Sequence, residues 1–261
     1  MKRYAIFSDI DGTLVSFKTH RIPQSTIDAL TEAKARGHRF YISTGRPSQF
    51  IINLHDIEHL IDGYVSTNGA LCYVGETVVA RHSIEPADCK TIIDYCDDLQ
   101  VPLAVVGEKT IAIIRATATM KTLFEGYLGL RMSDYPDHLP AVEGQPILQI
   151  TPFITVDQER ELFTRLHACT SGRWHPAFTD ITHVLADKAT GLTAIARHEG
   201  FAADATIAFG DGGNDEPIIK AAGIGVAMGN GNDHTKQVAD YVTDSVDDDG
   251  FAHALRHFGL I

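Results

Sequence analysis

The chain has 261 residues, of which 44% are hydrophobic and 21% charged, and its formal net charge is −12. This acidic excess argues against non-specific binding of nucleic acid, because such proteins neutralise phosphates with a basic face. The sequence holds no run of the roughly 18 to 20 apolar residues that a membrane-spanning helix needs, and its cysteines form no C-x-x-C pair. We therefore expect a cytoplasmic protein without nucleic-acid or membrane partners.

Short apolar runs alternate with helical patterns in the first quarter of the chain. We expect a strand over 2–8, a helix over 22–36, a strand over 38–43, a helix over about 48–59 and a strand over 63–66. The same alternation returns with a helix over 191–199, a strand over 206–209, a helix over 217–222 and a strand over 224–228. This alternation predicts a parallel sheet with both faces covered, whose ligand lies at the carboxyl ends of the strands.

The middle of the chain breaks the alternation. It combines β-rich pieces over 110–115 and 147–152 with helical pieces over 88–100 and 156–168. The interval between Thr44 and Lys188 leaves room for a domain of about 100 residues. We therefore expect an α/β fold in which a Rossmann-like core, residues 1–82 and 183–261, is interrupted by an inserted α+β domain over 83–182.

Two carboxylates directly follow the first predicted strand, in the sequence Asp9-Ile10-Asp11-Gly12-Thr13. A pair spaced in this way can divide the work, with Asp9 attacking a phosphorus atom and Asp11 protonating the departing oxygen. Gly12 allows a sharp turn and a close approach of the backbone to a ligand. The structural alternative is a turn that carries solvated acids.

The second predicted strand ends at Ser43-Thr44-Gly45-Arg46-Pro47. The Thr44 hydroxyl is suited to a phosphoryl oxygen, although it could equally cap a helix. Arg46 could hold a phosphate or carboxylate through its planar fork, or form a structural ion pair. Lys188, just before a predicted helix, can neutralise charge on a nucleophile and a phosphoryl group, whereas most lone lysines are solvated surface residues.

A glycine-rich acidic loop, Gly210-Asp211-Gly212-Gly213-Asn214-Asp215, follows another predicted strand. Carboxylates at a strand end, followed by Asn-Asp, offer the oxygen ligands that Mg²⁺ prefers. Plain turn chemistry is the alternative. Two distant acidic loops that each follow a strand of one sheet favour a shared site.

In order and spacing, these four segments resemble the four motifs of the haloacid dehalogenase superfamily of phosphohydrolases, and in particular its Cof-type branch, subclass IIB. The resemblance implies that Asp9 is the nucleophile and Asp11 the general acid and base. It also implies that Thr44 binds phosphate and that Lys188 balances charge.

The resemblance further implies a Mg²⁺ site formed by Asp9, the backbone carbonyl of Asp11, Asp211 and Asp215. The substrate phosphate would be bound by residues from all four motifs: Gly12, Thr44, Gly45, Arg46, Lys188 and Asn214. The inserted domain resembles the α/β cap that carries substrate selectivity in the Cof-type branch.

The function implied by the resemblance is Mg²⁺-dependent hydrolysis of a small phosphorylated metabolite, such as a sugar phosphate, through an aspartyl-phosphate. Two alternatives remain at this point. One is a phosphotransferase similar to the phosphomannomutases of the superfamily, and the other is a non-catalytic phospho-receiver or binding protein. The sequence leaves the substrate and the oligomeric state open.

Overall fold

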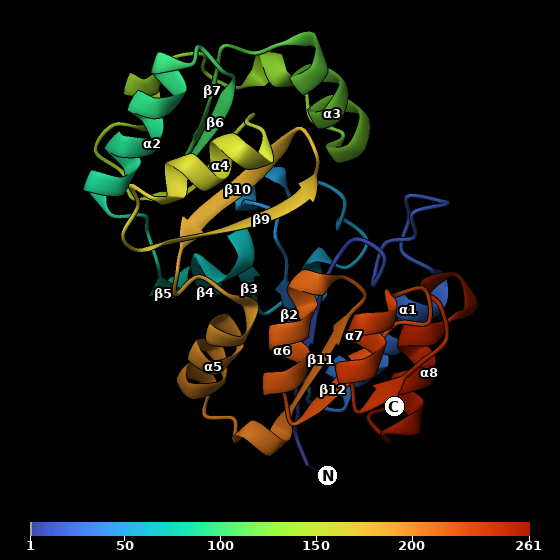
Figure 1. Cartoon of the computed structure of the whole chain (residues 1–261). Coiled ribbons are helices and arrows are strands. Elements are labelled where there is room, and N and C mark those ends of the chain that lie inside the picture. The colour runs from blue at the N-terminus through green and yellow to red at the C-terminus, as the bar shows by residue number, and fades with distance from the viewer. Residues whose placement is uncertain (1) are drawn as a thin grey trace. The chain divides into compact units, whose positions relative to one another are not determined.

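The structure is a computed structural model that describes residues 2–261, apart from the side chains of Tyr127 and Leu128. Met1, the first residue of the expected core, lies outside the described residues. The chain forms two compact units (Figure 1). Unit 1 comprises Met1–Arg46, Ile51–Arg81 and Asp187–Ile261, and unit 2 comprises Pro47–Phe50 and His82–Ala186.

Unit 1 is built on an eight-stranded sheet in the order β13-β12-β11-β1-β2-β3-β4-β5. Its strands are β1 (Ala5–Ser8), β2 (Arg39–Ser43), β3 (Gly63–Ser66), β4 (Leu71–Val74), β5 (Thr77–Arg81), β11 (Thr206–Gly210), β12 (Ile224–Ala227) and β13 (Tyr241–Val242). Its helices are α1 (Gln24–Ala35), α5 (Lys188–Glu199), α6 (Glu216–Ala221), α7 (Asp233–Val238) and α8 (Gly250–His257). The pairings from β13 to β3 are parallel, whereas β4 pairs antiparallel with both β3 and β5.

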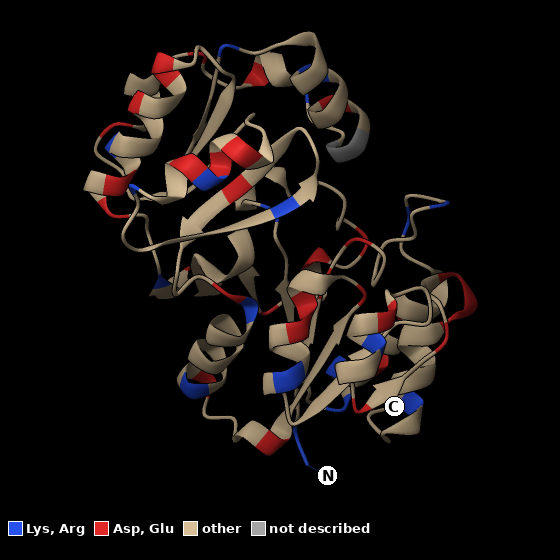
Figure 2. Cartoon of the chain, in the orientation of Figure 1, with Lys and Arg blue, Asp and Glu red and all other residues tan. Residues whose placement is uncertain are grey.

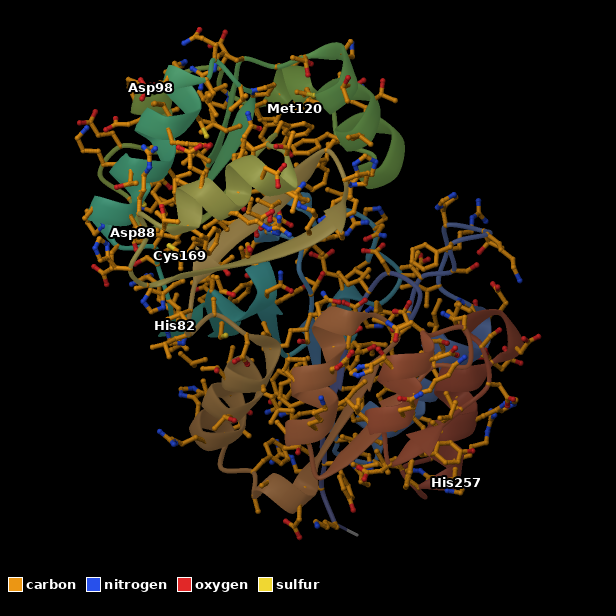
Figure 3. The ribbon with its side chains drawn as sticks, viewed as in Figure 1. His82, Asp88, Asp98, Met120, Cys169 and His257 are labelled. Carbon is orange, nitrogen blue, oxygen red and sulfur yellow. The ribbon has the colours of Figure 1, made fainter. Side chains whose placement is uncertain are left out.

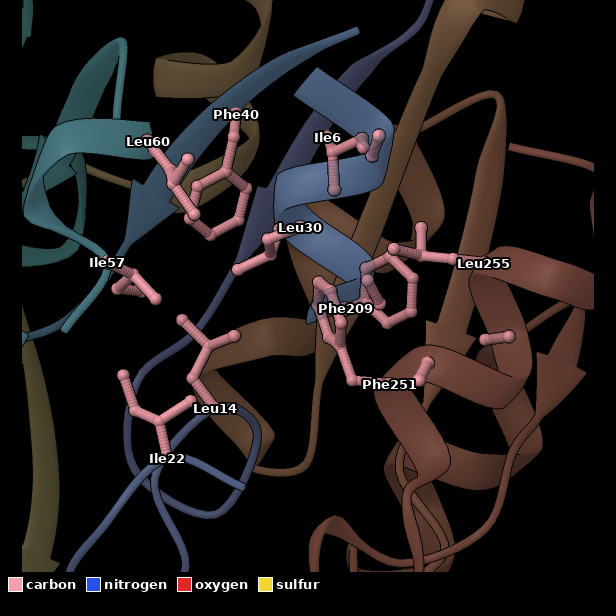
Figure 4. Close-up of a cluster of buried hydrophobic side chains, with 14 of the residues drawn as sticks. Ile6, Leu14, Ile22, Leu30, Phe40, Ile57, Leu60, Phe209, Phe251 and Leu255 are labelled. Carbon is pink, nitrogen blue, oxygen red and sulfur yellow. The ribbon is translucent and has the colours of Figure 1, made fainter. Parts of the chain in front are cut away.

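Alternate residues of the central strands feed two separate cores. Ile6 and Phe209 pack with residues of α1 and α8 on one face (Figure 4). Phe7, Tyr41 and Ala208 pack with residues of α5 and α6 on the other face. Because side chains alternate along a strand, the uninterrupted apolar runs seen in the sequence serve both faces. Burial of each Ile or Phe side chain contributes roughly 1.5–3 kcal/mol to the stability of the fold.

Unit 2 has its own antiparallel sheet, in the order β7-β6-β8-β10-β9. Its elements are β6 (Leu103–Gly107), β7 (Ile111–Ile114), β8 (Ile147–Pro152), β9 (Cys169–His175), β10 (Phe178–His183), α2 (Pro86–Asp98), α3 (Ala118–Leu128) and α4 (Val156–Phe163). Ile92 of α2 and Leu162 of α4 form a core with Val105, Ile150 and Ile181 of the sheet. The mixed α/β fold with a mostly parallel sheet is therefore confirmed, together with a separate antiparallel domain.

The prediction of a helix over 48–59 is wrong. This segment contains only two 3-10 turns, Ser48–Phe50 and Glu58–Leu60. Phe50 packs edge-on against Phe124 within unit 2, whereas Leu54 and Ile57 belong to the core of unit 1. One amphipathic helix presents its apolar residues to a single core, so a segment divided between two cores cannot form one.

Other expected elements differ from the structure in extent. The helix expected over 156–168 ends at Phe163. The hairpin β4–β5 was not predicted. Among the described residues, no helix is both long and apolar enough to cross a membrane.

Candidate active site

Three polar residues follow neighbouring strands of the unit 1 sheet. Strands β11, β1 and β2 are parallel neighbours, and Asp211, Asp9 and Thr44 come just after them. The backbone N–H of Asp9 donates to the carbonyl of Phe209 at 3.1 Å, which continues the strand pairing by one residue. The three residues therefore leave the sheet at its carboxyl edge, where α/β sheets bind ligands.

A cluster of carboxylates surrounds a buried lysine at this edge. Asp9, Asp211 and Asp215 each offer a carboxylate oxygen, and these oxygens lie within 4.8 Å of one another. Lys188 Nζ donates to Asp9 Oδ1 at 2.6 Å and to Asp215 Oδ1 at 2.5 Å. Lys188 begins α5, and its side chain is fully buried. This lysine is therefore part of the cluster and is not a solvated surface residue.

The second oxygen of Asp215 is fixed by the backbone of its own loop. Asp215 Oδ2 accepts hydrogen bonds from the N–H groups of Asp211 at 3.0 Å and Gly212 at 2.9 Å. Asp211 Oδ1 accepts from the hydroxyl of Thr13 at 3.0 Å. The acidic loop is thus held in one arrangement by contacts from two motifs.

The charges of this cluster do not cancel. Three ionised carboxylates against one ammonium leave an excess of two negative charges. Burial raises the pKa of Asp9 well above its usual range. The positive charge of Lys188 acts to lower this pKa, and the negative charge of Asp215 acts to raise it further. Burial, together with the charge of Asp215, raises the pKa of Asp211 to about 7. Burial acts to lower the pKa of Lys188. The negative charges and hydrogen bonds of Asp215 and Asp9 have a larger effect, so that the pKa is raised.

The donor set fits a hard divalent cation. Such ions take carboxylate oxygens as ligands, and a charge of +2 would offset the excess of the cluster. Asp9, Asp211 and Asp215 provide these oxygens within a small volume at the end of the sheet. The residues present therefore fit Mg²⁺.

Asp11 and Arg46 form a bidentate ion pair. Arg46 Nε donates to Asp11 Oδ2 at 2.8 Å, and Nη2 donates to Oδ1 at 2.9 Å. The backbone N–H of Arg46 donates to the Thr44 hydroxyl oxygen at 3.1 Å. Of the two roles considered for Arg46, the structure shows an ion pair, and its partner is the other acid of the first motif.

Gly12 is required by both its backbone conformation and its surroundings. Its φ is +83°, and a Cβ atom there would lie 2.3 Å from Asp211 Oδ2. Its carbonyl accepts a hydrogen bond of 2.7 Å from Asn230 Nδ2. Sequence reasoning did not single out Asn230, although it follows β12 at the same edge of the sheet as the acidic loop.

Asn68 connects the second and fourth motifs. Its backbone N–H donates to the carbonyl of Thr44 at 3.0 Å, and its side-chain Oδ1 accepts from Asn214 Nδ2 at 3.3 Å. A Cβ atom at Gly45 would lie 3.2 Å from the same Oδ1. The structure therefore links Gly45 and Asn214, both predicted phosphate-site residues, through a residue that the strand-end pattern alone does not select.

All ten predicted site residues lie in unit 1. Asp9, Lys188, Asp211 and Asp215 form one cluster, while Asp11, Arg46 and Thr44 form a second connected group. Gly12 contacts the first cluster, and Gly45 and Asn214 adjoin Asn68. A buried carboxylate beside an ammonium, with a cation site and a second acid nearby, can perform nucleophilic attack on an electrophile that carries negative charge.

Comparisons with known proteins agree with this arrangement. The family model described as haloacid dehalogenase-like hydrolase matches residues 6–255. YkrA of Bacillus subtilis (strain 168), provisionally named a phosphatase, is 32% identical over 258 residues, covering 98% of each chain.

Solved structures of phosphatases from the same superfamily also resemble this chain. The subclass IIB sugar phosphatase BT4131 is 42% identical, with a TM-score of 0.90 over 99% of this chain and 100% of that chain. The phosphatase BT1666 of Bacteroides thetaiotaomicron is 33% identical, with a TM-score of 0.87 over 99% and 96% of the two chains. The chain therefore belongs to the haloacid dehalogenase-like hydrolases, and its membership of the Cof-type, subclass IIB branch is confirmed.

Proposed function

We propose that this hydrolase is a Mg²⁺-dependent phosphatase that acts on a small phosphorylated metabolite through an aspartyl-phosphate at Asp9. The observation that carries the proposal is the cluster of Asp9, Asp211 and Asp215 around the buried Lys188. Likeness to a sugar phosphatase at 42% identity over nearly the whole chain supports a phosphomonoester substrate.

The two acids of the first motif divide the chemistry. A carboxylate oxygen of Asp9 attacks phosphorus in line, a bond from Asp9 to phosphorus forms, and the bond to the leaving oxygen breaks. Asp11 gives its proton to the leaving alkoxide and then takes a proton from the water that hydrolyses the aspartyl-phosphate. Hydrolysis releases inorganic phosphate and restores Asp9.

The remaining residues bind and position the phosphoryl group. Lys188 and the Thr44 hydroxyl contact its oxygens, and the backbone at Gly12, Gly45 and Asn214 shapes the space around it. Mg²⁺, held by Asp9, Asp211, Asp215 and the Asp11 carbonyl, would neutralise charge on the phosphoryl oxygens when bound. Because Arg46 occupies both oxygens of Asp11, proton donation requires this ion pair to open, which frees Arg46 for the substrate phosphate.

We also propose that residues 1–82 and 183–261 form the catalytic core and that 83–182 form the cap that selects the substrate. The larger segment of unit 2, His82–Ala186, supports this division, although unit 2 also includes Pro47–Phe50.

A cytoplasmic location and a small-molecule partner are part of the same proposal. The four cysteines are free thiols, which suits a reducing compartment. Figure 2 shows acidic residues along α2 and α4, and acidic residues do not attract the phosphates of nucleic acid.

The test is phosphate release from sugar phosphates and phenyl phosphate, with and without Mg²⁺, beside Asp9→Asn. We expect release that depends on Mg²⁺ and falls by at least about a thousandfold in the variant, since the nucleophile is lost. Full turnover by a folded Asp9→Asn protein would exclude the mechanism. Transfer of phosphate to a sugar with little free phosphate would instead favour the phosphotransferase alternative, and a stable phosphoprotein without turnover would favour a receiver.

A further inference from the structure

The segment that follows β12 contacts both acidic loops of unit 1. This segment, residues 228–235, leaves the carboxyl end of β12 and runs into α7, which begins at Asp233 (Figure 1). It donates hydrogen bonds to three backbone carbonyls, that of Gly12 in the first motif and those of Asp211 and Gly212 in the fourth. One short segment therefore fixes the backbone of two loops that are distant in the sequence.

Thr235 makes the buried contact of this segment. Its hydroxyl donates to the carbonyl of Gly212 at 2.9 Å, and the residue is fully buried. The N–H of Asn232 donates to the carbonyl of Asp211 at 3.0 Å, and its side-chain Oδ1 accepts from the N–H of Thr235 at 2.8 Å. Gly212 in turn donates its N–H to Asp215 Oδ2 at 2.9 Å. The Thr235 hydroxyl is therefore linked through Gly212 to a carboxylate of the cluster.

Asn230 makes the contact with the loop of the first motif. Its Nδ2 donates to the carbonyl of Gly12 at 2.7 Å, and its Oδ1 accepts from the N–H of Val246 at 2.8 Å. Both ends of the amide are thus occupied, which fixes its orientation. Val246 is buried in the core of unit 1 and anchors the amide. Asn230 itself is exposed, so water can replace part of what its amide provides.

The two loops need such contacts because their charges repel. Asp9 of the first motif and Asp211 and Asp215 of the fourth have carboxylate oxygens within 4.8 Å of one another, and like charges at this distance repel. The donors of the 228–235 segment described above are an amide, a hydroxyl and a backbone N–H, all of which are neutral. They oppose separation of the loops without reducing the negative charge that attracts a divalent cation.

We propose that Thr235 and Asn230 are positioning residues that hold the loops of the first and fourth motifs at the separation that Mg²⁺ binding requires. Both act through backbone carbonyls, and neither belongs to the proposed Mg²⁺ ligands. Replacing a residue that orients metal ligands typically weakens metal binding about ten-fold to a hundred-fold. This inference rests on the proposed function, because that function supplies the cation.

The test measures Mg²⁺ affinity without substrate, by calorimetric titration of the protein with MgCl₂. Thr235→Val removes the hydroxyl and nearly conserves the volume, so the carbonyl of Gly212 loses its donor. The Kd for Mg²⁺ should rise about ten-fold or more. Thr235→Ser keeps the hydroxyl and should have a Kd close to that of the wild type. Asn230→Ala should raise the Kd by less than Thr235→Val, because the amide is exposed.

The matched control is Thr243→Val. Thr243 is also buried, and its hydroxyl donates to the backbone carbonyl of another glycine, Gly250, at 2.7 Å. Thr235→Val and Thr243→Val should lower Tm by similar amounts, because each leaves a carbonyl without its donor. Only Thr235→Val should weaken Mg²⁺ binding.

Three results would overturn the positioning role. They are an unchanged Kd in a folded Thr235→Val protein, an equal rise in Thr243→Val, and an equal rise in Thr235→Ser. If Thr235→Val does not fold, Asn230→Ala tests the same role at an exposed position, and an unchanged Kd in that variant would overturn it.

Phosphate release distinguishes this inference from the phosphatase function. The Mg²⁺ concentration for half-maximal release should rise in Thr235→Val by the same factor as the Kd, and excess Mg²⁺ should restore most of the rate. Weaker Mg²⁺ binding in Thr235→Val, without any phosphate release by the wild type, would support the positioning role and reject the phosphatase function. Phosphate release by the wild type with an unchanged Kd in Thr235→Val would do the reverse. A wild type that binds no Mg²⁺ would overturn both the positioning role and the Mg²⁺ dependence of the proposed reaction.

Discussion

Gly12 shows how a single residue joins the backbone to the chemistry of the site. It directly follows Asp11, the second acid of the first motif, and lies next to Asp211, in a conformation that side chains rarely adopt. A substitution there would act twice, through backbone strain and through displacement of the Asp211 carboxylate. The two effects can be separated, because Gly37 has a similar φ of +90° and no atom within 4 Å of a Cβ placed on it.

We therefore predict that Gly12→Ala abolishes most phosphate release, whereas Gly37→Ala does not. Both variants should lose about 1–2 kcal/mol of unfolding free energy from the left-handed conformation. Only Gly12→Ala places a methyl group on Asp211 and so disturbs the carboxylate cluster. Urea denaturation and phosphate-release assays on the two proteins would check this. Equal activity in the two variants would show that the contact with Asp211 is unimportant.

At the scale of residues, the sequence identifies side chains that follow strands and carry charge. Asp9 and Asp211 lie close together because the parallel neighbours β1 and β11 place their loops at one edge, and Lys188 Nζ reaches Asp9 from the start of α5. Asn68 and Asn230 form hydrogen bonds to amide or backbone groups. The pattern Asn68-Gly69-Ala70 is compatible with either a site residue or a plain turn, and Asn230 has no distinctive pattern in one sequence. The ion pair of Arg46 with Asp11 likewise depends on rotamers that spacing does not determine.

Among the elements, buried parallel strands were predictable because they read as continuous apolar runs. The hairpin β4–β5 was not predictable, since β5 lies at the edge of the sheet with mostly half-buried or exposed residues.

In unit 2, polar contacts also join the elements. Asp88 of α2 is buried beside Cys169, at the start of β9 (Figure 3). Its carboxylate accepts from the backbone N–H groups of His167 and Ala168.

Asp88→Asn should destabilise the protein by about 1–3 kcal/mol at neutral pH, since charge-assisted hydrogen bonds are lost. Burial works to raise the pKa of Asp88, but hydrogen bonds from Ala168 and His167 outweigh it and lower the pKa below its usual value of 3.8. A lowered folded-state pKa stabilises the fold above the unfolded-state pKa, and this contribution disappears as pH falls through the folded-state value.

The difference in stability between the wild type and Asp88→Asn should therefore be constant from pH 5 to 8, roughly, and shrink below about pH 4. Thermal denaturation across this range would measure it. Asp137→Asn is the control, because Asp137 has a side chain that is 94% exposed. A difference that grows on acidification would contradict the assigned role of the hydrogen bonds.

At the scale of the whole molecule, the carboxylate cluster of unit 1 lowers the stability of the fold while providing the residues of the proposed reaction. Asp9, Asp211 and Asp215 repel one another at short range, and Lys188 offsets only part of this charge. Two charges about 5 Å apart interact by roughly 3 kcal/mol at an effective dielectric constant of 20. A protein that binds a divalent cation there gains stability from the ion, as any ligand specific for the folded state provides.

Asp211→Asn should therefore be more stable than the wild type when Mg²⁺ is removed by a chelator, by roughly 1–3 kcal/mol or several degrees in Tm. Asn keeps an oxygen for the Thr13 hydroxyl and removes one negative charge. The wild type should gain more in Tm than the variant when Mg²⁺ is added, and the variant should release little phosphate. Calorimetry with and without Mg²⁺ would measure the difference in stability and the gain in Tm, with Asp137→Asn as a charge-matched control. A phosphate-release assay would measure the loss of activity. If Asp211→Asn were less stable than the wild type without Mg²⁺, repulsion among the three carboxylates would not be the dominant cost of the site.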